Sequence, residues 1–171
     1  MPSPSPQPEA VPEVLPEALP ETLPEVLRPP LGAPVGLLLE SRIPARLAWV
    51  GNDGTPRVVA IWFLWTGDEL AMSTFAGAQK LSGITEGTIV AVTIDTDTFP
   101  YRSLKLRGPV TVRPVDGLAE EYRLAARRYL GEEMASRWLD FLDGATQVVL
   151  SLRPTWARAA DMNTDSPFMT D

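Results

Sequence analysis

The chain has 171 residues, a formal net charge of −7 and 44% hydrophobic residues, and this length suits one soluble domain with a tail. Cysteine and histidine are both absent, which excludes disulfides, zinc fingers, thiolate nucleophiles, Ser-His-Asp triads and histidine-ligated haem. No Asp/Glu cluster has the spacing of a calcium-binding loop, so we expect no metal site. If the chain is an enzyme, we expect a bound cofactor to supply the reactivity. No basic block, long apolar run or signal-peptide layout is present, so we expect no nucleic-acid partner, no membrane span and a cytoplasmic location.

The first 30 residues form a segment of unusual composition. They hold ten of the 18 prolines, and residues 12–27 (PEVLPEALPETLPEVL) repeat the unit Pro-Glu-x-Leu four times. A proline at every fourth position prevents a helix, so we expect a disordered, polyproline-II-rich tail over 1–30, followed by a folded domain over 31–171. The favoured interpretation is a solvated tether. The alternative is weak docking through one repeat unit at a time.

Strand patterns dominate the rest of the chain. A short helix is expected at 35–41, and one long helical segment at 118–142 that Gly131 breaks in two. The expected strands are 46–50, 56–65, 70–74, 88–95, 102–113 and 146–152, with a short further one at 156–160. Residues 51–54 have hairpin-turn composition, Gly108 and Pro109 mark a bend, and 79–85 has the pattern of one or two helical turns. The sequence therefore predicts a mainly β protein, an antiparallel Greek-key barrel of six or so strands with peripheral helices.

Three motifs in fixed order are similar to those of a known superfamily. They are DGTPRVV at 53–59, MSTFAGAQK at 72–80 and YRSLKLRG at 101–108. Together they resemble the FMN-binding split-barrel proteins related to pyridoxamine 5′-phosphate oxidase, and in particular the branch of flavin/deazaflavin oxidoreductases that use FMN or coenzyme F-420. The resemblance covers about residues 37–160.

The resemblance implies a cofactor site at the interface of a homodimer. In that family the cofactor ring rests on the second strand, and its phosphate lies near the end of the third strand and the turn after it. Carried over by position, the implied cofactor-binding residues are Arg57, Val58, Val59, Ala60 and Ile61 at the ring, Ser73, Thr74, Gln79 and Lys80 at the phosphate, and Ser103 in place of a glutamine that contacts the flavin. Hydroxyls position a phosphate, and a lysine neutralises it as a point charge.

Two departures from the phosphate oxidases bear on the activity. Those enzymes carry Ser-Arg-Lys where this chain has AQK at 78–80, and their C-terminal segment that grips the vitamin has no match after Pro154. A dianionic phosphate substrate needs such cations, so oxidation of vitamin B6 is not expected. The reduced phosphate clamp leaves the larger deazaflavin coenzyme open beside FMN.

The leading hypothesis is an oxidoreductase that transfers hydride between bound F-420 or FMN and a small organic substrate. No catalytic side chain can be assigned, and Tyr101 is the best candidate for an auxiliary acid, although aromatic packing explains it equally well. Trp62 and Trp65 are expected on one strand and on opposite faces, one filling the barrel and the other near a ring or partner. The alternatives are a non-catalytic carrier of the same cofactors and a dimeric platform that displays the tail.

Overall fold

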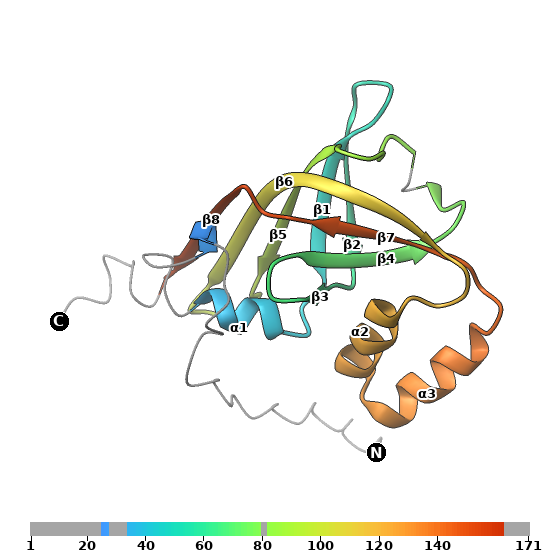
Figure 1. Ribbon diagram of the computed structural model, residues 1–171. Helices are drawn as coiled ribbons and strands as arrows, with labels where there is room; N and C mark the ends of the chain where they lie inside the picture. Colours follow the sequence, from blue (N-terminus) through green and yellow to red (C-terminus); the bar gives the residue numbers. More distant parts are fainter. Residues whose placement is uncertain (1–24, 28–33, 80–81, 163–171) are drawn as a thin grey trace, which may run out of the picture.

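The computed structural model describes residues 25–27, 34–79 and 82–162. Within these ranges the chain forms one curved antiparallel sheet with helices against it (Figure 1). The strands are β1 (Ala45–Val50), β2 (Pro56–Ile61), β3 (Leu64–Trp65), β4 (Leu70–Phe75), β5 (Ile89–Asp95), β6 (Arg102–Val115), β7 (Gln147–Leu152) and β8 (Trp156–Asp161). None of the helices in the described ranges is long and apolar enough to cross a membrane.

The strand order makes the sheet a half-barrel. It runs β2-β1-β5-β6-β7-β4-β3, and β8 pairs with β6 beside this path. β4 joins β7 instead of its sequence neighbour β5, which is the predicted Greek-key crossover. Along this path β2 lies at one end of the sheet and β3 at the other. The predicted mainly β split barrel is confirmed, and the described part of the chain forms eight strands where six or so were expected.

The long strand β6 joins the two halves of the barrel. Its first part pairs with β5 and β8, and its part from Val110 onward pairs with β7. The change of partner falls at the predicted bend. A Cβ on Gly108 would lie 2.3 Å from the carbonyl oxygen of Arg153, so the close approach of these two backbones requires glycine here.

The second strand is shorter than the sequence predicted. Residues 56–65 split into β2 and the two-residue β3, and Trp62 and Phe63 between them belong to neither strand. The prediction of one strand that carries Trp62 and Trp65 is therefore wrong. A continuous apolar run gives no alternation from which such a break could be read. The predicted helical turn over 79–85 falls partly on residues 80–81, outside the described ranges.

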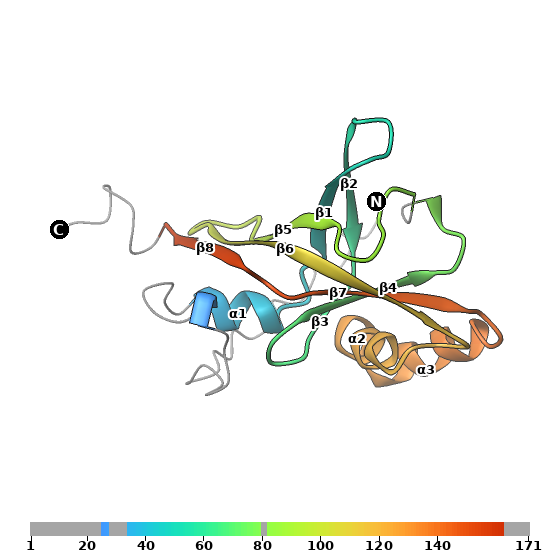
Figure 2. The ribbon, with the colours of Figure 1, turned by 45° about the horizontal axis from the view of Figure 1, so that its top comes forward.

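The helices pack at two places. Helix α1 (Pro34–Glu40) lies near the β5, β6 and β8 side, and α2 (Glu120–Leu130) and α3 (Glu132–Phe141) lie together under β4 and β7 (Figure 2). Gly131, with φ of 78°, separates α2 from α3, so the predicted break is confirmed. A small second core, which includes Ala71, Tyr122 and Val149, fills the space between the sheet and these two helices.

The main core fills the barrel, and it includes one residue of the Pro-Glu-x-Leu repeat. Leu27, in the 3-10 helix η1 (Glu25–Leu27), is only 1% exposed and belongs to the barrel core. The tether interpretation did not anticipate this burial, because the repeat alone does not distinguish its last leucine from the others. The remainder of the tail lies outside the described residues.

Candidate functional site

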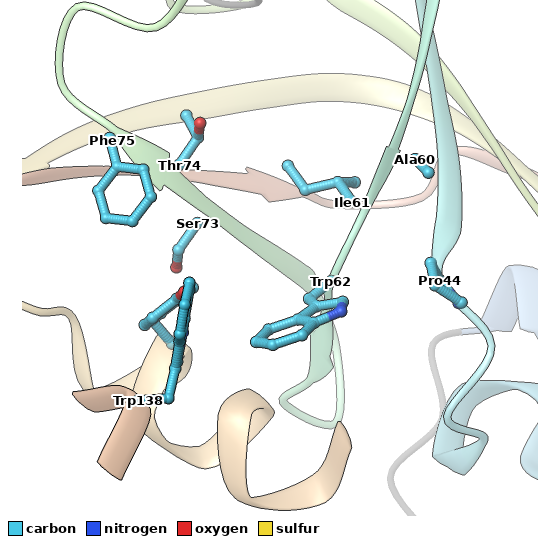
Figure 3. Close-up of a pocket in the computed structure, with 9 residues that line it drawn as sticks. Pro44, Ala60, Ile61, Trp62, Ser73, Thr74, Phe75 and Trp138 are labelled. Atoms are coloured by element: carbon cyan, nitrogen blue, oxygen red, sulfur yellow. The ribbon is translucent and has the colours of Figure 1, made fainter. Parts of the chain in front are cut away.

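A pocket of about 290 Å³ lies between β2 and β4, and we call it the split pocket. β3 pairs only with Leu70 and Ala71, so the outer half of β4 has no strand partner on that side among the described residues. Within the described ranges β2 pairs only with β1. The pocket is therefore placed where the barrel is open. Its lining residues are Pro44, Ala60, Ile61, Trp62, Ser73, Thr74, Phe75, Tyr122 and Trp138 (Figure 3).

Four of the ten residues implied by the resemblance meet in this pocket. Ala60 and Ile61 come from the end of β2, and Ser73 and Thr74 from β4. Residues 12 or more positions apart in the sequence thus line one pocket. Their role toward a cofactor remains a prediction.

The other implied residues lie elsewhere. Arg57 forms an ion pair with Asp53 at 3.2 Å beside the hairpin turn, Val58 and Gln79 are exposed, and Val59 packs against the barrel core. Lys80 lies outside the described residues. The structure thus does not bring Arg57, Val58, Val59 or Gln79 into the split pocket of one chain.

Arg57 is held by the hairpin turn and not by the pocket. Hydrogen bonds from the hydroxyl and backbone N–H of Thr55, with a smaller contribution from Arg57, lower the pKa of Asp53 to about 2. Asp53 is therefore a carboxylate at neutral pH and is available to pair with the guanidinium. A cofactor would have to compete with this exposed ion pair.

Two hydroxyls in the split pocket are buried without a partner. The Oγ of Ser73 and the Oγ1 of Thr74 make no hydrogen bond to any described residue, and Thr74 is 3% exposed. Adjacent residues of a strand face opposite sides of the sheet, so Ser73 faces α2 and α3, and Thr74 faces the barrel. Buried polar groups nearly always have a partner, and leaving one unpaired costs about 1–3 kcal/mol. Because both residues line the split pocket, their hydroxyls are available to bind a ligand there.

An aromatic wall closes the side of the pocket toward the helices. It consists of Trp62, Phe75, Tyr122 and Trp138. Trp62 stacks on Tyr122 with ring centroids 6.0 Å apart, and Phe75 meets Tyr122 edge-on at 6.2 Å. Trp62 also stacks on Tyr129 of α2, with ring centroids 5.0 Å apart and an interplanar angle of 7°. Of this wall, the sequence identified only Trp62 as a residue that could lie near a ring.

A hydrogen bond fixes the phenol of Tyr122. The Nε1–H of Trp138 donates to the Tyr122 hydroxyl oxygen over 2.8 Å, which links α2 to α3 across the second core. Burial raises the pKa of Tyr122 above its ordinary value of 10, and the hydrogen bond from Trp138 opposes this only in part. The phenol therefore keeps its proton at neutral pH. Among the described residues nothing accepts that proton, so the pocket contains an unused donor.

Ser103 lies at a second pocket, which we call the outer pocket. It measures about 500 Å³ and is lined by Thr93, Asp95, Thr96, Tyr101, Arg102, Ser103, Lys105, Ala160 and Met162. Ser103 and Tyr101 are thus not part of the split pocket of one chain. We choose the split pocket as the candidate site, although it is smaller, because four implied residues line it and two of these carry an unpartnered hydroxyl.

An open antiparallel half-barrel with an apolar pocket and unpaired hydroxyls at its seam has the features of a small-molecule-binding protein. The family model described as pyridoxamine 5′-phosphate oxidase matches residues 36–160. The chain belongs to this family of flavin-binding split barrels. The resemblance carried by the three motifs is thereby confirmed.

Several solved structures are similar to this chain. An F-420 reductase is 33% identical, with 71% of this chain and 93% of that chain covered, at a TM-score of 0.58. An FAD and haem binding protein from Mycobacterium smegmatis is 20% identical over 72% of this chain and 68% of that one, at 0.50. The haem storage protein HutZ from Vibrio cholerae is 14% identical over 77% and 94%, at 0.52. The last two support the fold alone, and no curated protein matches the chain.

Proposed function

We propose that the chain is an oxidoreductase that transfers hydride between bound F-420 or FMN and a small organic substrate. The observation that carries this proposal is the pair of buried, unpartnered hydroxyls of Ser73 and Thr74 in a pocket where the resemblance places the cofactor. Similarity to an F-420 reductase at 33% identity supports the reductase activity and the deazaflavin.

The residues of the pocket fit such a cofactor. Ile61 and Trp62 offer apolar surface to a ring system, and the two hydroxyls offer donors to polar ring or chain atoms. When bound, the flavin or deazaflavin supplies the atom that gives or takes the hydride. The chain's own contribution is to hold the ring, to exclude water with the aromatic wall and to orient the substrate.

The proposed active form is a homodimer. The outer face of β1, β2 and β5 carries exposed valine and isoleucine side chains: Val58 is 65% exposed, Val50 62% and Ile89 59%. Ala60 lies on this face too, and it also lines the split pocket. A second copy seated on this face would therefore cover the pocket as well. Exposed apolar side chains that neighbour one another on a sheet face are suited to a protein–protein contact.

The size of the pocket supports the same arrangement. At about 290 Å³ it lies at the lower end of the range for small-molecule sites, which is about 300–1,000 Å³. A nucleotide-sized cofactor would extend beyond it. The resemblance implies a cofactor site at the dimer interface, and the outer pocket with Ser103 is the surface that we propose a second copy adds to it.

A cofactor titration tests the proposal. The purified chain is titrated separately with F-420 and FMN while the cofactor fluorescence is followed. The bound cofactor is then reduced with dithionite and mixed with an organic acceptor under anaerobic conditions. We expect saturable binding of one cofactor, and reoxidation of the reduced cofactor by the acceptor in a single turnover. If neither cofactor binds, the proposal is overturned.

A non-catalytic carrier of the same cofactors is the second candidate. It is favoured by the lack of any charged side chain among the residues that line the split pocket. Tight binding without turnover for every acceptor tried would identify the carrier.

A further inference from the structure

We propose that the acidic repeat of the tail docks on three cations on the outer face of β6 and β8 of the same chain. The docking segment is residues 12–24, which carry three glutamates. The cations are Lys105, Arg107 and Arg158, and we call them the basic patch. A docked repeat makes the tail a cover for part of the sheet instead of a solvated tether.

The register of β6 and β8 brings these cations together. Lys105 is directly opposite Arg158, and Arg107 is opposite Trp156. The leucines on either side of Lys105 are buried, so Lys105, Arg107 and their partners on β8 point away from the barrel core. The guanidinium of Arg107 lies over the ring of Trp156, 5.0 Å from its centroid. Strand pairing therefore builds a basic surface that the linear sequence, with no basic block, does not show.

The three cations form no ion pair within the described ranges of the chain. Two aspartates of β5 and β8 are already engaged, because Asp95 pairs with Arg46 at 3.3 Å and Asp161 pairs with Arg102 at 3.1 Å. Like charges directly opposite each other on neighbouring strands repel. An acidic segment bound over the basic patch would relieve this repulsion.

Charge and position identify the tail as the occupant. Residues 1–27 contain five glutamates and no lysine or arginine. Helix η1, at the end of the repeat, lies against β8 (Figure 1). In the described part of the chain β8 pairs only with β6, so its other edge leaves a route from η1 to the outer face. Four residues of polyproline II span about 12 Å, close to the ~10 Å between two packed sheets, so Glu21 and Glu17 are within reach of the basic patch.

A second copy of the chain fits the basic patch less well. In a two-fold contact centred on the patch, the same cations would face each other and repel. The patch also differs from the proposed cofactor site, because Arg107 and Arg158 line neither the split pocket nor the outer pocket. Weak contacts suffice for the tail, because its covalent attachment gives an effective concentration of about millimolar.

Zero-length carbodiimide coupling of the full chain tests the docking, because it joins an amine to a carboxylate only where the two are in contact. Lys80 and Lys105 are the two lysines of the chain, so mass spectrometry of the digest assigns each product. We expect about fivefold or more tail coupling at Lys105 than at Lys80, and its loss in about 0.5 M NaCl. Equal tail coupling of the two lysines, or none at Lys105, would overturn the proposal. A product that migrates as a covalent dimer would overturn the assignment to the same chain.

Variants of the basic patch locate the contact. The double variant Arg107→Gln/Arg158→Gln keeps Lys105 as the reporter, and its tail coupling should fall about fivefold because the two neighbouring cations are lost. The double variant Arg123→Gln/Arg137→Gln, which removes the same charge from α2 and α3, should leave the coupling unchanged. Undiminished coupling in the first variant, with its circular dichroism spectrum intact, contradicts the proposal.

A charge-preserving substitution gives the reverse test. Arg158→Lys places a second reactive amine in the basic patch, and we expect this amine to couple to the tail. Arg137→Lys on α3, beside its ion-pair partner Glu133, is the matched control and should not couple to the tail. Tail coupling at the α3 position as strong as at the β8 position would show that the repeat samples the whole surface and does not dock.

Discussion

At the scale of single residues, the split pocket depends on hydroxyls that the fold buries without pairing them. Ser73 and Thr74 sit on opposite faces of β4, just beyond the last residue of β4 that pairs with β3. An apolar residue at either position would be less costly to the folded chain, since a buried unpaired hydroxyl destabilises it. Retaining both makes sense if a bound molecule supplies the missing partners.

Thr74→Val separates stability from binding. Valine has nearly the shape of threonine but no hydroxyl, so we expect the free chain to gain about 1 kcal/mol of unfolding free energy and the cofactor affinity to fall about five- to twentyfold. Urea denaturation and cofactor titration measure the two effects. Thr111→Val, at an exposed position of β6, serves as control and should change neither. A loss of stability in Thr74→Val would mean that the hydroxyl already has a partner, such as water.

Lys80→Ala tests the implied phosphate contact. Loss of a charge-assisted contact should weaken FMN binding by about one to two orders of magnitude. Riboflavin, which lacks the phosphate, should bind equally well to the variant and to the parent chain. Arg137→Ala, which removes an exposed arginine paired with Glu133 on α3, controls for the general loss of positive charge. Equal losses for FMN and riboflavin would show that Lys80 does not serve the phosphate.

At the scale of elements, alternation and turn composition predicted most strands within a residue or two. The break in the strand at Trp62 and Phe63 was missed, because residues 61–65 are all apolar. Such a run has no alternation of apolar and polar residues that would show where a strand ends. Tyr122 and Trp138 were not recognised as site residues, because an aromatic residue on an amphipathic helix is normally predicted to pack in the hydrophobic core. Their meeting across α2 and α3 is a tertiary contact that sequence spacing does not encode. Ala60, Ile61, Ser73 and Thr74 were identified through motif resemblance.

The short helix η1 provides a prediction at this scale. Leu27→Ala should cost about 2–5 kcal/mol of unfolding free energy, because the side chain is buried in the barrel core and its removal leaves a cavity. Leu124→Ala, at an exposed position on α2, should stay within about 0.5 kcal/mol of the parent. Thermal or urea denaturation compares the two. A Leu27→Ala variant as stable as the Leu124→Ala control would show that the repeat is a solvated tether up to its end.

At the scale of the whole molecule, the open barrel leaves two features that one chain does not complete. The split pocket is small for a nucleotide cofactor, and the sheet face beside it carries several exposed apolar side chains. On that face the register aligns Ala48 with Val58 on one side and with Ala91 on the other, so the apolar surface continues across three strands. A second copy of the chain is the proposed cover for both features.

Val58→Glu tests the dimer and the cofactor site together. A charge placed on the apolar face must be desolvated in the interface, and in a two-fold dimer it is introduced twice, so we expect the dimer Kd to rise roughly 100-fold. Sedimentation measures this change. Met134→Glu, at a position of similar exposure on α3, should leave the dimer intact. Ala60 belongs to both the apolar face and the split pocket, so loss of the dimer should also weaken cofactor binding. We expect the cofactor affinity of Val58→Glu to be low at protein concentrations where the chain is monomeric. The affinity should recover at higher protein concentrations, where the dimer forms again. A monomeric variant that binds cofactor as tightly as the parent would place the whole site within one chain.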